Sequence, residues 1–273
     1  MLLWPVVIVV GFYLLLALAL FLFQSRMIFI PITDLMITPG QAGLDYEDVV
    51  IPVSDGAAIH GWYFRSAADS PQTSLKVVML CHGNAGNIAH RLETAEFIMH
   101  QGADILLWDY RGYGRSTGSP TEQNLYDDAD ACFNWLQSDK GFRPQDIIIF
   151  GRSLGGAVAI DLARRERSGG LVVESAFTTA ADMGHKVFPF LPVRWLLRFK
   201  FNSIDKIGDV NVPIVVAHSP NDEIVPYKMG RALFEAATAP KRFVKLSGGH
   251  NERHYFSDPA YIAAWRDMLA GGI

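Results

Sequence analysis

Apolar residues along most of this chain occur in short runs, and from residue 77 onward these runs alternate with longer stretches rich in helix-forming residues. Short runs of branched and aromatic residues are typical of buried strands. The predicted strands are 46–53, 58–64, 77–81, 104–108, 147–150, 171–173, 214–217 and 243–246, and the predicted helices are 88–100, 125–136, 157–165, 227–236 and 261–269. This alternation predicts an α/β fold, with about eight strands in a mostly parallel sheet and helices on both faces.

The N-terminus departs from this alternation, because Leu2 to Phe23 contains no charged residue. A helix of about 20 apolar residues crosses the ~30 Å hydrocarbon core of a bilayer. The pattern therefore predicts a single membrane-spanning anchor at residues 1–25. Residues 26–44, which include Pro, Gly and Thr, are predicted to form a membrane-proximal connector, and residues 45–273 to form the folded domain.

A cleaved signal peptide is the alternative interpretation of the same segment. It is less favoured because no basic residue precedes the apolar run, which is also longer than the roughly 7–15 residues of a signal-peptide core. The motif Ala17-Leu18-Ala19 resembles a cleavage site but lies inside the run. Arg26 is the first charged side chain after the span, and the positive-inside rule weakly favours a cytoplasmic position for the folded domain.

Charge and cysteine content remove several classes of function. The formal net charge is -4, the sequence pI is about 6.0 and no run of Lys or Arg is present, so no nucleic-acid partner is expected. Cys81 and Cys132 have neither the spacing of a metal site nor that of a redox pair, and they imply no disulfide framework. The sequence carries no signal for an oligomeric state.

A possible nucleophile lies between the predicted strand 147–150 and the predicted helix 157–165, in the stretch Gly151-Arg152-Ser153-Leu154-Gly155. A Gly-x-Ser-x-Gly pattern at a strand-to-helix turn is typical of a nucleophile elbow. The turn would expose Ser153 Oγ and place the Leu154 N–H at the helix N-terminus, where it can stabilise an oxyanion. A Gly-rich turn of an ordinary α/β protein is the alternative, which the flanking strand and helix make less favoured.

A serine hydroxyl becomes a good nucleophile when a base takes its proton, and an acid must orient that base. Asp222 follows the predicted strand 214–217, and His250 lies in a Gly-rich loop after the predicted strand 243–246. The order of Ser153, Asp222 and His250, each just past a strand, favours them as nucleophile, acid and base. The alternatives are Glu223 and Glu174 for the acid, and His82, His218 and His254 for the base.

A second oxyanion donor is expected in the loop after strand 77–81, whose sequence is His82-Gly83-Asn84-Ala85-Gly86-Asn87. Glycines allow the backbone of this loop to turn an N–H inward. We assign this role to Asn84, with Ala85 as the alternative. A phosphate-binding loop is disfavoured, because the loop has neither the Lys of a P-loop nor the Gly-x-Gly-x-x-Gly spacing.

Six motifs give the chain a resemblance to the α/β-hydrolase superfamily: HGNAGN, DYRGYGRSTGSPTE, GRSLGGAVAI, ESAF, SPNDEIVP and GGHNE. More narrowly, the chain resembles the membrane-anchored bud-emergence-like α/β-hydrolase-domain branch, from about Arg26 to the C-terminus. The resemblance implies an α/β-hydrolase fold with Ser153, Asp222 and His250 as the catalytic triad. It also implies that Asn84 and Leu154 form the oxyanion hole.

The sequence as a whole predicts a membrane-anchored serine hydrolase, an esterase or lipase that cleaves acyl esters through an acyl-enzyme intermediate. The resemblance itself specifies no substrate, because members of the family are described as esterases, lipases and protein or lipid thioesterases. No metal or organic cofactor is required for this chemistry, and the expected partners are an acyl ester or lipid substrate and the bilayer. An acyl thioesterase or a lipid or protein deacylase is the next alternative. A serine peptidase is less favoured, and a non-catalytic scaffold on the same fold is the least favoured.

Members of this family usually carry a cap inserted over the active site, which corresponds here to residues 177–203. This segment mixes aromatic and basic residues, and Phe188, Trp195 and Phe199 are its predicted substrate or lid residues. Trp195 and Phe199 are four residues apart, as are Arg194 and Arg198, so a helix here would carry one aromatic and one basic stripe. The segment is either a membrane-facing lid that admits acyl chains to Ser153, or a cap whose aromatic residues pack on the core.

Overall fold

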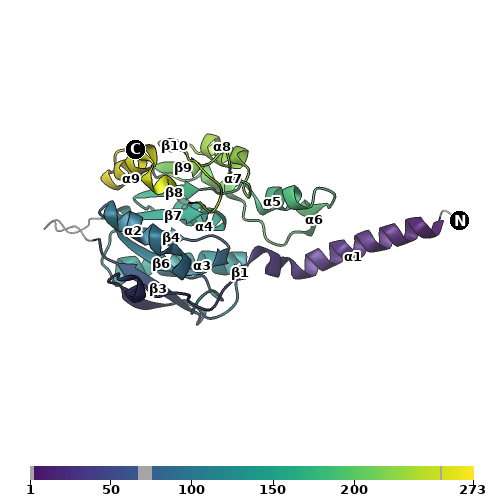
Figure 1. The fold of residues 1–273 in the computed structure, drawn as a ribbon, viewed down its shortest axis with the longest axis horizontal. Helices are drawn as coiled ribbons and strands as arrows, with labels where there is room; N and C mark the ends of the chain where they lie inside the picture. The colour runs from purple at the N-terminus through teal and green to yellow at the C-terminus, as the bar shows by residue number, and fades with distance from the viewer. Residues whose placement is uncertain (1–2, 67–75, 253) are drawn as a thin grey trace.

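The computed structural model describes residues 3–66, 76–252 and 254–273, and eight strands of this part of the chain form one sheet in the order β10-β9-β8-β7-β4-β6-β3-β2 (Figure 1). The strands from β10 to β6 are parallel, whereas β3 and β2 are antiparallel to their neighbours. The strands are β2 (Glu47–Pro52), β3 (Ala58–Phe64), β4 (Val77–Cys81), β6 (Asp104–Trp108), β7 (Ile147–Arg152), β8 (Gly170–Glu174), β9 (Ile214–His218) and β10 (Lys241–Lys245). The predicted mostly parallel sheet is confirmed.

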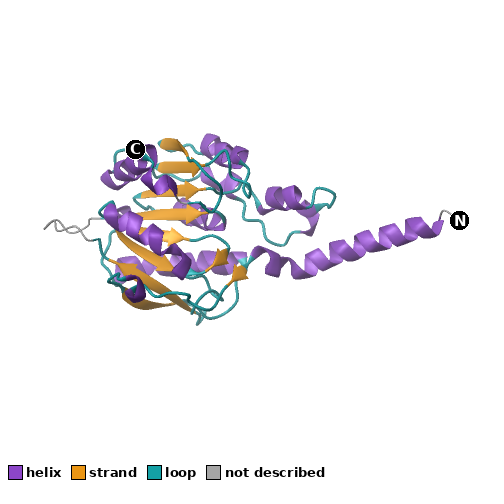
Figure 2. Ribbon diagram, in the orientation of Figure 1, coloured by secondary structure: helices purple, strands orange, loops and turns teal. Residues whose placement is uncertain are grey.

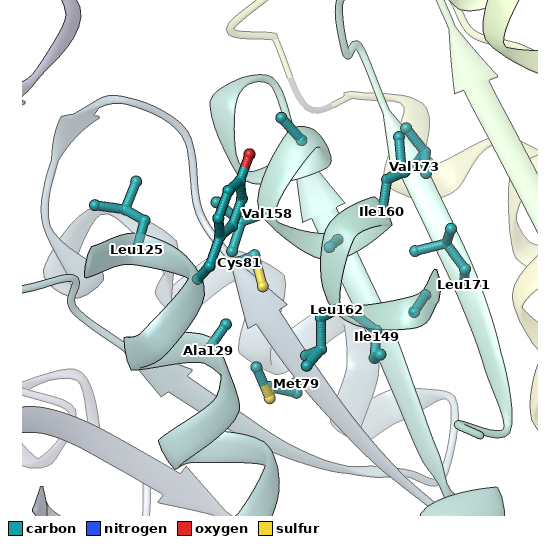
Figure 3. Close-up of a cluster of buried hydrophobic side chains, with 14 of the residues drawn as sticks. Met79, Cys81, Leu125, Ala129, Ile149, Val158, Ile160, Leu162, Leu171 and Val173 are labelled. Atoms are coloured by element: carbon teal, nitrogen blue, oxygen red, sulfur yellow. The ribbon is translucent and has the colours of Figure 1, made fainter. Parts of the chain in front are cut away.

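Helices cover both faces of the sheet (Figure 2). One face packs against α3 (Glu122–Ser138), α4 (Leu154–Arg165) and α8 (Tyr227–Ala236), and the other against α2 (Leu92–His100) and α9 (Pro259–Ala270). Side chains alternate across a strand, so Met79 joins Leu125 and Val158 in the first core (Figure 3), whereas Val78 belongs to the second. Short 3-10 turns occur at Gly40–Ala42, Ile88–Arg91, Pro144–Asp146 and His254–Ser257.

The N-terminal apolar run forms a single helix, α1 (Leu3–Ile28), which projects from the domain (Figure 1). The stretch from Trp4 to Ile28 is long and apolar enough to cross a membrane, by length and composition. Leu2, the first residue of the predicted span, lies outside the described residues. The helix continues through Arg26 to Ile28, so the first residues of the predicted connector are helical. Arg26 lies in the last turn, where a cation is favourable.

The connector packs on the domain. Its first strand, β1 (Ile30–Pro31), pairs in parallel with β5 (Ala85–Gly86), and the Ile30 N–H donates to Asn84 O at 3.1 Å. Phe29 is buried, and its ring meets that of Phe199 edge-on with the centroids 5.3 Å apart. The end of α1 is therefore fixed beside the loop that carries Asn84.

The cap segment, residues 177–203, contains two short helices, α5 (Ala180–Val187) and α6 (Val193–Leu196), and is followed by α7 (Ser203–Ile207). The expected helix with Trp195 and Phe199 on one stripe does not form, because α6 ends at Leu196. Trp195 is 89% exposed, whereas Phe199 packs against Phe29. The two rings therefore do not share a face, and Phe199 has the core-packing role.

Side chains from distant elements explain why α6 stops. The Arg198 N–H donates to Gln24 Oε1 of α1 at 2.7 Å, and the Phe201 N–H donates to Glu122 Oε1 of α3 at 2.8 Å. These backbone donors therefore bind tertiary partners instead of helix carbonyls. Tertiary contacts of this kind override a local helical pattern.

Candidate active site

Ser153 lies at the sharp turn between β7 and α4. Its φ of 54° and ψ of -119° fall in a region that residues with side chains rarely adopt, and such strain is common at functional sites. A Cβ on Gly151 would collide with Gly155 O, and a Cβ on Gly155 would collide with Cys81 O. Glycine at these two positions therefore permits the turn that presents Ser153.

The structure brings Ser153, Asp222 and His250 together from the ends of three strands. His250 Nε2 lies 3.2 Å from Ser153 Oγ, and His250 Nδ1 lies 2.7 Å from Asp222 Oδ2. Asp222 Oδ1 accepts hydrogen bonds from the N–H groups of Ile224 and Val225 at 2.9 and 2.7 Å. The carboxylate is thus fixed, and the imidazole is placed where it can take a proton from the serine.

A second histidine, His218 at the end of β9, also contacts Asp222. Its Nε2 lies 3.3 Å from Asp222 Oδ2 and 3.0 Å from Val225 O. Burial raises the pKa of Asp222, but the hydrogen bonds from His218 and His250 outweigh this effect, and the pKa lies well below its ordinary value. Asp222 is therefore ionised at neutral pH. From the sequence, His218 is predicted only as an alternative base. Its position at a strand end, four residues before Asp222, is the sequence feature that could have indicated the contact with Asp222.

Glu174, an alternative acid in the sequence, belongs to a separate buried network. It accepts hydrogen bonds from Arg152 Nε at 2.9 Å and from the hydroxyls of Tyr255 and Tyr261 at 2.6 Å each. Arg152 also donates from Nη2 to the backbone oxygen of His250 at 2.5 Å. This network therefore connects the turn that carries Ser153 to the loop that carries His250, a role that no sequence motif indicated.

Asn84 and Leu154, the two expected oxyanion donors, line the same cavity as Ser153. Leu154 is the first residue of α4, where backbone N–H groups have no partner within the helix. The backbone oxygen of Asn84 accepts a hydrogen bond from Tyr113 Oη at 2.8 Å, which fixes the loop. Ala85, the alternative donor, is exposed and pairs with the connector in β5, so its position favours Asn84 for this role.

The cavity beside Ser153 has a volume of about 330 Å³ and lies between α1 and the cap segment. Phe188, which is predicted from the sequence as a substrate or lid residue, is part of the cavity wall. Its α1 side consists of Leu20, Gln24, Met27 and Ile28, and the described residues that line it include no charged side chain. A concave, apolar site of this size suits an apolar ligand.

Sequence comparisons agree with this fold. The profile of the serine aminopeptidase family S33 (Hydrolase_4) matches residues 72–205. The chain is 37% identical over 247 residues to the uncharacterized protein Rv2307c of Mycobacterium tuberculosis, a match that covers 90% of this chain and 87% of the relative. It is 30% identical over 238 residues to the alpha/beta hydrolase domain-containing protein WAV2 of Arabidopsis thaliana, with 80% and 76% covered.

Solved structures share the architecture. The esterase Pf2001 of Pyrococcus furiosus superposes with a TM-score of 0.68 at 19% identity, covering 89% of this chain and 97% of the esterase. An alpha-beta hydrolase from Vibrio vulnificus gives a TM-score of 0.63 at 22% identity, covering 84% and 81%. The chain belongs to the α/β-hydrolase superfamily. This membership agrees with the fold that the sequence motifs predict.

Proposed function

We propose that this protein is a membrane-anchored serine hydrolase that cleaves carboxylic esters of acyl chains and belongs to the bud-emergence-like branch of the superfamily. The observation that carries the proposal is the 3.2 Å separation of His250 Nε2 and Ser153 Oγ beside an uncharged apolar cavity. A base within hydrogen-bond reach activates a serine. The cavity offers space for the acyl chain of the ester.

The reaction proceeds in two steps through an acyl-enzyme. Ser153 Oγ attacks the ester carbonyl carbon while His250 Nε2 takes the hydroxyl proton, and Asp222 stabilises the charged imidazole. The N–H groups of Asn84 and Leu154 stabilise the oxyanion. When the bond to the leaving alcohol breaks, His250 gives the proton to the alcohol oxygen. Water then attacks the acyl-enzyme in the same way and releases the carboxylic acid.

The charge of the cavity wall favours an acyl ester over a peptide. A serine aminopeptidase, the activity in the matched family's description, would bind a charged α-amino group, which carboxylates bind well. Among the described residues lining the cavity there is no carboxylate. An acyl thioester of a lipid or protein is the second candidate, because the same nucleophile and cavity would serve it. The contact of Ser153 with His250 argues against a non-catalytic scaffold.

We further propose that α1 is retained as a single-pass anchor and is not a cleaved signal peptide. Ala17, inside the possible cleavage motif, is buried in a small cluster with Leu191 and Val193 of the cap segment. Cleavage after Ala19 would remove this contact and expose the two cap residues. Arg26 directly after the uncharged run favours a cytoplasmic position for the domain.

A fluorophosphonate probe and p-nitrophenyl esters of increasing chain length test the activity of the full-length protein in detergent. We expect the probe to label Ser153 alone and the esters to be hydrolysed. Ser153→Ala should abolish both signals, whereas Ser138→Ala, at an exposed serine of α3, should retain both. Ester turnover by Ser153→Ala at the wild-type rate would refute the proposal.

A further inference from the structure

The part of α1 from Tyr13 onward is packed against the cap segment. Ala17 forms a small apolar cluster with Leu191 and Val193, and Tyr13 Oη donates to Phe190 O at 3.1 Å. In Figure 1, α5 and α6 lie beside this part of α1, and the N-terminal part of the helix extends beyond them. The part of α1 from Tyr13 onward therefore packs on the folded domain and is also part of the apolar helix.

Gln24 connects α1 to the cap segment through two hydrogen bonds. Only 3% of its surface is exposed, its Oε1 accepts the Arg198 N–H at 2.7 Å, and its Nε2 donates to Leu196 O at 3.2 Å. Buried backbone groups without partners cost free energy. A leucine at this position would fill similar space but would leave both backbone groups without these partners.

The cavity beside Ser153 lies at the junction between α1 and the cap segment. Leu20 and Met27 contribute to its α1 wall, and Phe188 and Leu191 contribute to its cap wall. The volume of about 330 Å³ lies within the size range of small-molecule pockets, and its apolar lining suits an acyl chain.

The cap segment lies beside the apolar stretch of α1 and not beyond its end. A membrane span needs about 20 apolar residues, and Tyr13, which contacts the cap, lies ten residues before Phe23, where the apolar run ends. Phe190 and Trp195 of the cap are 90% and 89% exposed. Rings exposed beside a membrane-spanning helix are suited to enter a bilayer. The occupant of this face is therefore lipid.

We propose that α1 forms one wall of the acyl-binding site, held to the cap segment by Gln24, and that an acyl ester enters this site from the bilayer between α1 and the cap. This inference rests on the proposed hydrolase activity and adds the source of its substrate. Met27 and Ile28 continue the wall from α1 toward Asn84, whose Nδ2 donates to Ile28 O at 3.2 Å, so the lining of the cavity runs from α1 to the proposed oxyanion site.

Two tryptophan substitutions on different faces of α1 test the wall, with full-length protein reconstituted into phosphatidylcholine vesicles. Leu20→Trp should fill the cavity, whereas Leu22→Trp, at a position 57% exposed, should not. We expect Leu20→Trp to lower kcat/KM for p-nitrophenyl decanoate by about tenfold or more, and to lower kcat/KM for p-nitrophenyl acetate by a clearly smaller factor, because the substitution fills the space proposed for the acyl chain. Gln24→Leu should give the same selective loss.

The outcomes distinguish the inference from the activity on which it rests. If the wild type hydrolyses both esters and Leu20→Trp behaves like Leu22→Trp on p-nitrophenyl decanoate, α1 is not a wall of the acyl-binding site, and the proposed hydrolase activity stands. If the wild type hydrolyses neither ester, the proposed function is overturned together with the inference.

A cysteine label tests entry from the bilayer independently of activity. Cys81 and Cys132 are buried, so Phe190→Cys can be labelled selectively with a polarity-sensitive dye. In vesicles we expect its emission to shift to shorter wavelength and to be quenched by spin-labelled lipid. Val50→Cys, at a position 67% exposed on the edge strand β2, should show neither effect. Unquenched emission from position 190, as from a cap that faces water or a protein, would overturn entry from the bilayer.

Discussion

His218 Nε2 lies 3.3 Å from Asp222 Oδ2, the same oxygen that His250 Nδ1 meets at 2.7 Å. His218 Nε2 is also 3.0 Å from Val225 O, and a carbonyl oxygen only accepts hydrogen bonds, so this nitrogen carries a proton. His218 therefore donates toward Asp222 without touching Ser153 in this geometry. It is a positioning residue, whose contribution to the rate acts through Asp222.

Substitution of His218 should separate this positioning role from a general loss of structure. We expect His218→Leu to lower kcat for a short p-nitrophenyl ester by about tenfold or more with KM nearly unchanged, because a displaced acid misorients the base. His218→Gln, whose amide can still donate, should recover part of the rate. Steady-state kinetics on both variants measures the difference, and equal losses of kcat would argue against a hydrogen-bonding role.

Arg152 should be important for stability as well as for the loop of His250. Replacing it with methionine leaves the buried carboxylate of Glu174 without its cation, a change that typically costs about 3 kcal/mol or more. We expect Arg152→Met to lower the free energy of unfolding by that amount in urea titrations, with reduced ester turnover. Arg115→Met, which removes an exposed ion pair with Asp48, should change stability little. Similar stabilities of the two variants would contradict this expectation.

The strands and the Ser153 turn could be predicted because their signals are local. The predicted strands 58–64, 77–81 and 104–108 match β3, β4 and β6 in both bounds, since a short, mostly apolar run that is buried in the sheet has few alternatives. The turn is similarly encoded, because only glycine at positions 151 and 155 avoids a backbone collision. Asp222 and His250 lie just past consecutive parallel strands, so their closeness to each other follows from the topology.

The cap segment could not be predicted because residues far away in the sequence determine it. The spacing of Trp195 and Phe199 indicates a helix, but the backbone N–H groups of residues 198, 200 and 201 donate to the side chains of Gln24 and Glu122, and this stretch is not helical. The contact of α1 with the cap has no signal in either segment, since an apolar helix has no preferred partner face by composition alone. The buried network of Arg152 could not be predicted either, because it requires a tertiary contact between the turn that carries Ser153 and the loop that carries His250.

Asp222 also determines how stability depends on pH. Burial alone would raise the pKa of Asp222, but the hydrogen bonds from His218 and His250 lower it by more. The folded-state pKa therefore lies well below the ordinary value of about 3.9. The group therefore contributes stability that is present above about pH 4 and is lost as pH falls toward the folded-state pKa. We expect the free energy of unfolding to fall more steeply from about pH 5 to pH 3 in the wild type than in Asp222→Asn. Equal pH slopes in urea titrations would contradict this assignment.

Glu122, the first residue of α3, should control the base of the cap segment. Its carboxylate accepts the backbone N–H groups of Lys200 and Phe201 at 2.6 and 2.8 Å. Phe201 has a φ of 38°, a left-handed conformation whose strain is of order 1–3 kcal/mol. Without the carboxylate, these two N–H groups lose their acceptor and the strained residue loses its support. We therefore expect Glu122→Ala to loosen residues 198–202 locally.

Hydrogen exchange measures this loosening directly. In Glu122→Ala the amides of Lys200 and Phe201 should exchange faster, while strands β4 and β7 keep their protection, because the core of the sheet does not depend on Glu122. Gln123→Ala, at the exposed neighbouring position whose side chain hydrogen-bonds to Asp127, should leave both cap amides unchanged. Unchanged exchange in Glu122→Ala would show that the cap base is held by apolar packing of the buried Phe201 ring alone.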